Sequence, residues 1–445
     1  MSAWGAAAAA AAVGAVALLS RRLAPTPVSG PMVLVAAGLA CGPVGLDLVD
    51  LARDSEAVTL LLEAALVAVL FTDASTVRWS ALRRDDSLPL RLLGLGLPLT
   101  MVLGALVAWV LLPGFTLWEL ALVAVILAPT DAALGQPAIT DPRVPATVRQ
   151  GLNVESGLND GIALPFFVVL LAAATGDTGG AGAGEVFVLA LGLSTAVGVA
   201  VGWIGARVLA WSTAHGWIAE EWQRVPALGV AVLGYCVTVS LEGSGFITAW
   251  VAGLVFGVVW RRSAPRPAAA SSGPAGATGL VEQVGDVLAS CSFFIFGAVL
   301  LGPALSAIDW RTALYALLSL TVVRMLPVAA ALTGSRLRLP TVLYVGWFGP
   351  RGLASIVFAL LLLEDGPLAA DRLVDVVALT VGLSVVLHGA SAARAARAYG
   401  SWHAGAVAVD PALREGPAEP APAAPTGTLP PVPRAPGGSA PRIPG

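Results

Sequence analysis

Long apolar stretches separated by short polar connections recur along almost the whole chain. About thirteen of them are long enough to cross a bilayer as a helix. They lie near residues 4–20, 31–49, 57–77, 93–112, 116–136, 148–173, 186–210, 225–242, 245–260, 283–303, 312–334, 340–363 and 373–392. The pattern therefore predicts an all-α polytopic membrane protein, with a transmembrane domain over residues 1–392 and a tail over residues 393–445.

Composition agrees with this class. Hydrophobic residues make up 57% of the chain and charged residues only 12%, whereas soluble proteins carry about 25% charged residues. The first stretch has no basic segment before it, and Arg21 and Arg22 follow it directly. We therefore predict a first transmembrane helix here rather than a cleaved signal peptide.

Arginines, which are the only basic residues apart from histidine, gather at alternate connections. One set of connections holds Arg21, Arg22, Arg78, Arg83, Arg84, Arg91, Arg143, Arg149, Arg207, Arg224, Arg261, Arg262, Arg266, Arg336 and Arg338. The other set holds only Arg53, Arg311 and Arg372. Because arginine-rich connections stay in the cytoplasm, we predict an external N-terminus and a cytoplasmic tail, in the plasma membrane. The tail is rich in Pro, Ala and Gly and is predicted to be largely disordered.

Six charged residues lie deep inside the predicted spans. They are Glu63, Asp131, Glu155, Asp160, Arg324 and Arg351. A charge at mid-membrane costs about 2.5–3.5 kcal/mol even on the lenient insertion scale, so such residues usually have a function. Four acids against two arginines leave negative charge that attracts a cation. Glu63, in the outer half of the third span, has the alternative of facing water.

The fifth and twelfth spans are each interrupted near their midpoint. Pro129 precedes Thr130 and Asp131, and Gly349-Pro350 precedes Arg351. Paired interruptions in two antiparallel halves indicate an inverted-repeat transporter, here with spans one to six and eight to thirteen as the repeats. Asp131 would then compensate free N–H ends and Arg351 free C=O ends, while carbonyls near Thr130 face an ion. The alternatives are a helix cap without ion contact for Asp131 and a purely structural role for Arg351.

The sixth span carries a polar face. Ser156 and Asp160 are four residues apart and share one side of a helix, and hydroxyl and carboxylate oxygens suit a hard monovalent cation. Glu155 and Asn159 form the neighbouring pair. Glu155 needs a counter-charge, which Arg324 can supply. Alternatively, Glu155 forms only a structural ion pair, and Asp160 is a buried acid satisfied by hydrogen bonds.

These residues together resemble a known family. The matching pieces are Thr130-Asp131, Glu155-Ser156, Asn159-Asp160-Gly161, Arg324 and Gly349-Pro350-Arg351-Gly352, with weaker matches at Leu70-Phe71, Gly243-Ser244-Gly245, Val251-Ala252-Gly253 and Phe293 to Gly297. In this order, over about residues 40–390, they resemble the NhaP-type (CPA1) branch of the monovalent cation:proton antiporters. Gly157, where leucine is common, and Ala132-Ala133, where proline and valine are usual, depart from the family pattern.

The resemblance implies an NhaA-like fold with two crossed broken helices, in a homodimer. Spans one to three and seven to ten would form the dimer scaffold, and spans four to six and eleven to thirteen the moving core. It also implies that Asp160 carries the ion or the proton, with Ser156, Asp131 and the Thr130 backbone as further ligands. Asn159 in place of a second acid resembles the electroneutral exchangers.

We therefore predict exchange of a monovalent cation, Na⁺ first and also Li⁺ or K⁺, for H⁺ by competition at Asp160. A K⁺/H⁺ antiporter and a cation-coupled symporter or channel are the alternatives. The chain contains no HExxH motif, and His215, His388 and His403 lie far apart, which disfavours a membrane hydrolase. His388, the histidine inside a span, is predicted to make packing or polar contacts. We expect membrane lipid around the protein, no cofactor and no nucleic acid.

Overall fold

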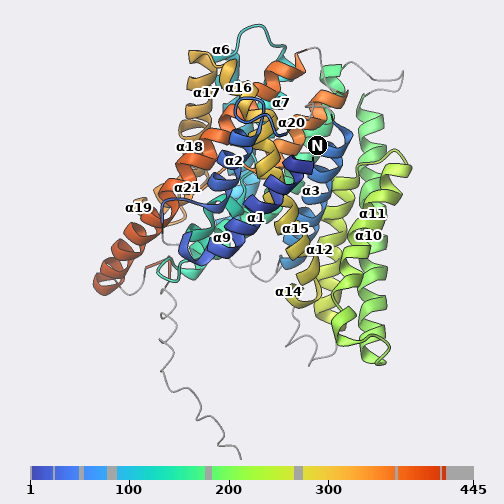
Figure 1. The fold of residues 1–445 in the computed structure, drawn as a ribbon. Helices are drawn as coiled ribbons and strands as arrows, with labels where there is room; N and C mark the ends of the chain where they lie inside the picture. The colour runs from blue at the N-terminus through green and yellow to red at the C-terminus, as the bar shows by residue number, and fades with distance from the viewer. Residues whose placement is uncertain are drawn as a thin grey trace, which may run out of the picture.

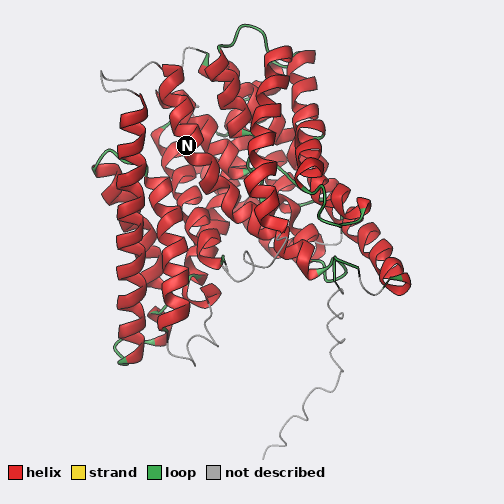
Figure 2. Ribbon diagram, turned by 180° about the vertical axis from the view of Figure 1, so that it is seen from behind, coloured by secondary structure: helices red, strands yellow, loops and turns green. Residues whose placement is uncertain are grey.

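The computed structural model describes residues 3–23, 26–49, 55–77, 88–175, 183–264, 274–365, 369–410 and 413–416. This part of the chain contains helices and their connections and no strands (Figures 1 and 2). Nine of its helices are long and apolar enough to cross a membrane. The remaining four predicted spans, the second, fifth, eighth and twelfth, appear as shorter helices or as interrupted pairs. The predicted all-α polytopic fold is confirmed.

The first half runs from the N-terminus to the long helix that follows the sixth span. Its elements are α1 (Ala3–Leu23), α2 (Gly30–Cys41), α3 (Glu56–Thr76), α5 (Leu88–Arg91), the π-helical η1 (Leu92–Gly96), α6 (Leu97–Leu111), α7 (Leu117–Ile126), the 3₁₀ turn η2 (Ala132–Gly135), α8 (Gln136–Thr140), α9 (Ala146–Thr175) and α10 (Ala183–Ala214).

The second half repeats a long and interrupted pattern. It comprises η3 (Glu220–Trp222), α11 (Val225–Ser240), α12 (Gly245–Ser263), α14 (Pro274–Ala277), α15 (Gly279–Ile295), the π-helical η4 (Phe296–Leu301), α16 (Gly302–Ser306), α17 (Trp310–Leu320), α18 (Val322–Ala331), α19 (Leu339–Trp347), α20 (Leu353–Asp365) and α21 (Ala370–Val409).

Local sequence explains why the fifth span begins and stops where it does. Thr116 accepts a hydrogen bond from the Glu119 backbone, and the Glu119 carboxylate accepts one from the Thr116 backbone at 2.6 Å, which is a capping box. The helix stops at Ile126 because Pro129 has no N–H to donate and disfavours helical backbone before it. Pro350 interrupts the twelfth span in the same way. The two extended segments cross, and the Asp131 backbone N–H donates to Pro350 O at 2.8 Å.

The last helix is longer than the apolar pattern predicted. Helix α21 continues to Val409, whereas the sequence placed the end of its span near residue 392. A turn at residues 413–416 then lies against the protein, with Leu413 and Glu415 buried. The rest of the predicted disordered tail, residues 417–445, lies outside the described residues.

The helices pack most extensively within two groups. Helices α1, α2, α3, α10, α11, α12 and α15 form one group, and α6, α7, α9, α17, α18, α19, α20 and α21 form the other. Glycines bring α12 against α3, because a Cβ at Gly253 or Gly257 would lie 2.2 or 2.1 Å from the carbonyl oxygen of Phe71 or Ser75. The groups meet where α9 contacts α3 and α12, and there Gly161 packs on the ring of Trp250.

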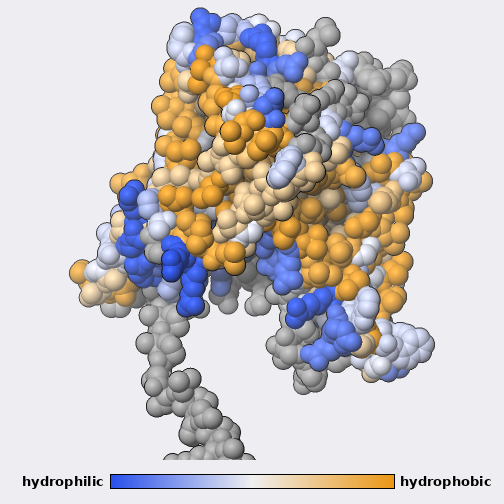
Figure 3. Space-filling view, viewed as in Figure 1, coloured by the Kyte–Doolittle hydropathy of each residue, from blue (hydrophilic) through white to orange (hydrophobic). Residues whose placement is uncertain are grey.

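The surface has an apolar band between two polar ends, as expected for a membrane protein (Figure 3). Several arginines make contacts at one end, which we call the arginine-rich end. Arg91 donates to Thr333 O at 2.9 Å, Arg207 to Ser263 at 3.5 Å, and Arg338 pairs with Asp410 at 3.1 Å. Predicted connection residues outside the described ranges are Arg53, Arg78, Arg83, Arg84 and Arg266.

Candidate ion-binding site

Asp131 lies where two helical segments begin. Its Oδ1 accepts a hydrogen bond from the backbone N–H of Ala133 at 2.8 Å, in the first turn of η2. Its Oδ2 accepts one from the backbone N–H of Leu353 at 2.9 Å, at the start of α20. One carboxylate therefore serves the positive ends of both segments.

Arg351 lies at the opposite kind of end. Its side chain is fully buried, and its Nη1 donates to Ala128 O at 2.7 Å and to Pro129 O at 3.0 Å. These carbonyls follow α7 and carry its negative end. Asp131 and Arg351 thus neutralise opposite ends of the interrupted helices, the arrangement inferred from the prolines in the sequence.

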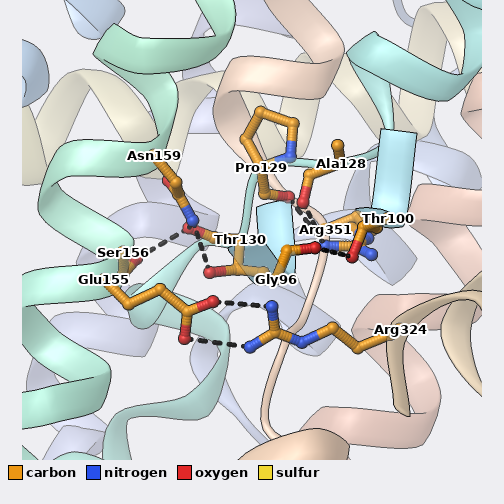
Figure 4. A network of polar contacts seen from close by, with 10 residues as sticks. All are labelled: Gly96, Thr100, Ala128, Pro129, Thr130, Glu155, Ser156, Asn159, Arg324 and Arg351. Atoms are coloured by element: carbon orange, nitrogen blue, oxygen red, sulfur yellow. Dashed lines mark hydrogen bonds and ion pairs between the residues drawn. The ribbon is translucent and has the colours of Figure 1, made fainter. Parts of the chain in front are cut away.

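Thr130, between these two charges, is fastened to α9. Ser156 Oγ donates to Thr130 O at 2.7 Å, and Asn159 Nδ2 donates to Thr130 Oγ1 at 2.7 Å (Figure 4). Because Ser156, Asn159 and Asp160 are close together on one helix, this contact brings the break of the fifth span up to the polar face of the sixth. The result is a set of carbonyl, hydroxyl and carboxylate oxygens, the ligand class that hard cations prefer.

Glu155 and Arg324 form a buried ion pair. Arg324 Nη1 and Nη2 donate to the two carboxylate oxygens of Glu155 at 2.6 and 2.9 Å, and the side chains are 3% and 1% exposed (Figure 4). Such a two-point contact is strong and directional. Glu155 is therefore held by Arg324, which makes it a poor candidate for direct exchange with a cation.

Asp160 differs from Glu155 and Asp131 in having no such partner. It is 8% exposed, and no donor among the described residues hydrogen-bonds to its carboxylate. The Asp131 and Asp73 carboxylates are near enough to interact with it electrostatically. A carboxylate in this setting attracts a proton or a cation, because either would balance its charge.

Asp73 is the acid that sequence reasoning missed. Asp73 lies on α3 and faces Gly157 of α9. A Cβ at residue 157 would lie 3.2 Å from the Cβ of Asp73, so the absence of a side chain at Gly157 makes room for Asp73. The sequence does place Asp73 inside the third predicted span, but it does not show how deeply in the membrane this residue lies. In the described residues no three acidic, His or Cys side chains alone form a metal site.

Glu63 lies apart from this site. It is half-buried and accepts a hydrogen bond from the Tyr235 hydroxyl at 2.9 Å, which joins α3 to α11. The alternative that it simply faces water is therefore replaced by a side-chain contact within the first group of helices.

A cavity of about 940 Å³ opens at the arginine-rich end. One wall comes from α1, α2 and α15, and the other from the segment after Asp131 and from α21. Leu134 and Gln136 line it, a few residues beyond Asp131, as do Asp286 and Ser290 of α15. The cavity therefore lies between the two groups of helices, close to the interrupted fifth span.

Comparisons with known proteins agree with this geometry. The model of the transmembrane region of the sodium/hydrogen exchanger family matches residues 8–398. A structure of the sodium proton antiporter MjNhaP1 from Methanocaldococcus jannaschii at pH 8 has a TM-score of 0.72 and 21% identity, covering 86% of this chain and 98% of that chain. A structure of the same antiporter from an electron-microscopy map gives 0.69 and 20%, covering 88% and 96%. At this identity the likeness shows a shared fold.

Proposed function

The chain belongs to the sodium/hydrogen exchanger family and is thus a multi-pass transporter that exchanges Na⁺ for H⁺, and we propose that both ions compete for Asp160. The observation that carries this proposal is the difference between three acids. Glu155 is held by Arg324, Asp131 by two backbone N–H groups, and Asp160 has no equivalent donor among the described residues. Of these three, Asp160 is the acid left to bind either ion, and the Asp73 carboxylate of α3 is close enough to interact with it.

The cation site is completed by neighbouring oxygens. Ser156 Oγ retains lone pairs while donating to Thr130 O, and a carbonyl oxygen can accept both that hydrogen bond and an ion. Asp131 adds a carboxylate from the broken helix. Asn159 supports the site because its amide donates a hydrogen bond to the Thr130 hydroxyl. The Asn159 amide contributes no charge.

Competition at one carboxylate couples the two fluxes. A protonated Asp160 cannot balance a cation, and a bound cation excludes the proton, so each return trip carries only one of them. We take α1–α3, α10–α12 and α15 as the scaffold and the remaining long helices as the core. The cavity between the two groups supports movement of one against the other and corresponds to a state open at the arginine-rich end.

The positive-inside rule supports placing that end in the cytoplasm of a cell whose plasma membrane contains the protein. The scaffold also exposes large apolar side chains along α10. They include Trp203, Ile204, Val208 and Trp211, each at least 47% exposed. A homodimer through the scaffold would cover such a surface, and lipid would cover the rest. The mass of the purified protein in detergent tests the dimer.

Replacing Asp160 tests the central proposal. Asp160→Asn keeps the shape of the side chain but can neither take up the proton nor balance the cation. We expect everted membrane vesicles with this variant to show no proton movement on adding NaCl, LiCl or KCl, with normal insertion and folding. Asp309→Asn is the control, because Asp309 is an N-cap at the start of α17 and Asn caps as well. Wild-type exchange in Asp160→Asn would refute the proposal.

The same vesicles separate the alternative transport modes. An antiporter moves protons against the direction of the added cation, whereas a symporter moves them with it and a channel does not couple them. A response to KCl larger than that to NaCl would identify a K⁺/H⁺ antiporter.

A further inference from the structure

The crossing has four half-helix ends, and three have been accounted for. Asp131 serves the starts of η2 and α20, and Arg351 serves the end of α7. The fourth is the end of α19, at Trp347. His388 of α21, which is 0% exposed, places its Nε2 at 3.0 Å from Trp347 O.

The other side of the His388 ring connects to the far side of the same interruption. The Arg351 backbone N–H donates to Ser384 Oγ at 2.7 Å, and Ser384 Oγ lies 3.1 Å from His388 Nδ1. Ser384 and His388 are four residues apart on α21 and share one face. Together they hold the residue before the break, Trp347, and a residue near its end, Arg351.

Donor and acceptor chemistry places a hydrogen on Nε2 of this histidine, because Trp347 O can only accept. Nδ1 lies 3.1 Å from both the hydroxyl and the carbonyl oxygen of Ser384. Ser384 Oγ accepts from the Arg351 backbone and has its own hydrogen left to donate to a neutral Nδ1, whereas a charged ring would donate to the Ser384 carbonyl instead. The neighbouring charges decide between these two forms.

We propose that His388 is a positioning residue for the cation site: as a neutral donor it caps α19 and, through Ser384, fixes the course of residues 348–352. The proposal rests on the function proposed above. Residues 348–352 are connected to the cation site by a few hydrogen bonds. The Leu353 N–H donates to Asp131 Oδ2, and Arg351 donates to the two carbonyls directly before Thr130. A shift at Trp347 therefore displaces two of the oxygens offered to the ion.

Charge explains why a neutral donor suits this place. The charged groups around the crossing are Arg351, Arg324, Glu155, Asp131 and Asp160, and the first two are already positive. A helix end carries only about half an elementary charge, which a neutral N–H can compensate. A further full positive charge would oppose a site that must accept a cation.

Substitutions at His388 test the proposal in proteoliposomes. In His388→Gln the amide reaches Trp347 O as Nε2 does, whereas His388→Leu leaves that carbonyl with the Gly349 backbone N–H, at 2.9 Å, as its remaining donor. We expect His388→Leu to raise the apparent KM for Na⁺ about tenfold, because a buried carbonyl at the break loses the donor that ties it to α21. His388→Gln should stay within about threefold of wild type. The matched control is His403→Leu, also on α21 and 1% exposed, but packed among Tyr399 and Trp402.

A general loss of stability would lower the amount of active protein in His388→Leu and His403→Leu alike and leave KM unchanged. An unaltered KM in His388→Leu, or equal effects of Gln and Leu, overturns the proposal. If His388→Leu does not fold, Ser384→Ala tests the same chain, and an unchanged KM there overturns it as well. Loss of transport in Asp160→Asn together with an unchanged KM at His388 would refute this inference and leave the proposed function intact.

A second measurement does not depend on transport. Nitrogen NMR of protein labelled with ¹⁵N-histidine reports which ring nitrogen carries hydrogen, and the His388 signal is identified by its loss in His388→Gln. We expect a neutral ring protonated on Nε2. A ring protonated on Nδ1, or on both nitrogens, overturns the inferred role.

Discussion

At the residue scale, the partners of the buried acids decide what each one can do. Glu155, Asp131 and Asp160 are alike in chemistry and lie within one crossing. A guanidinium neutralises the first, backbone N–H groups hold the second, and the third keeps its charge available. A buried carboxylate can therefore support structure at one position, and at another, in our proposal for Asp160, bind the transported ion.

We expect the Glu155–Arg324 pair to stabilise the folded protein. Arg324→Ala leaves a buried carboxylate without its counter-charge, at a cost of about 3–5 kcal/mol, and should lower folded yield and thermal stability. Adding Glu155→Gln removes the stranded charge, so the double variant should regain part of the loss. Thermal unfolding of the purified variants measures this. Strictly additive losses would show that the two residues do not interact.

Sequence reasoning identified this pair because few charges lie in the spans and they must balance. It missed Asp73, because the depth of a residue near a helix end depends on helix tilt and packing rather than on its place in an apolar run. It treated His388 as a contact residue without finding Trp347, because two carbonyls and a hydroxyl from different helices meet there only after folding.

At the element scale, Pro129 and Pro350 predicted the two interrupted helices, but prolines did not predict every irregularity. Pro129 and Pro350 coincide with full breaks, whereas Pro98 and Pro303 follow the π-helical η1 and η4. A proline lacks an N–H and crowds the preceding turn, and the packing around it decides between a wider turn and a break. Pro165 lies inside α9 and Pro327 inside α18 without a break, so a proline alone predicted neither the place nor the form of an irregularity.

Because α12 packs closely on α3, we expect alanine substitution to change stability very differently at Gly257 of α12 and at Gly229 of α11. In Gly257→Ala the new methyl group would lie 2.1 Å from Ser75 O, a carbonyl that also accepts a hydrogen bond from Arg261 at 2.8 Å. We expect a loss of about 1–3 kcal/mol in stability. Gly229→Ala, on α11 with nothing within 4 Å, should be neutral or stabilising by up to about 1 kcal/mol. Equal thermal stability of the two variants would contradict this packing.

Helix α19 is also held at its start, by the turn after α21. Glu415 Oε1 accepts hydrogen bonds from the Arg338 backbone at 2.9 Å and from Thr341 Oγ1 at 2.7 Å, and its carbonyl accepts one from Thr147 on α9. A carboxylate at a helix start is favourable because it satisfies free N–H groups and the dipole. Part of the tail predicted to be largely disordered thus makes a structural contact.

Two truncations test the contribution of this turn. A chain ending at Val409 loses Glu415 and should be destabilised by about 1–2 kcal/mol, because the start of α19 loses a charged cap. A chain ending at Gly416 keeps every contact of the turn and should unfold at the wild-type temperature. Glu415→Ala in the full chain should reproduce the first result. If both truncations unfold alike, the turn does not stabilise α19.

At the scale of the whole molecule, the arrangement predicts how much charge each cycle moves. Asn159 uses its amide to hold Thr130, and Glu155 is paired with Arg324, so neither adds a titrating carboxylate beside Asp160. Asp131 is fastened to two backbone N–H groups. If Asp73, the remaining acid near Asp160, keeps one protonation state throughout the cycle, one proton should exchange for one monovalent cation, with no net charge crossing the membrane.

Transport that moves no net charge should ignore membrane voltage. Each elementary charge carried would couple to about 2.3 kcal/mol per 100 mV, a large effect on the rate if it existed. In proteoliposomes with an imposed potassium–valinomycin potential and Na⁺ present, we expect the rate of internal pH change to be the same at either sign of potential. If K⁺ proves to be a substrate, a potential set without K⁺ is required. A rate that rises steeply with voltage would reveal a second proton carrier. Asp73→Asn, Asp131→Asn and Glu155→Gln would then identify it, because only the responsible change restores a voltage-independent rate.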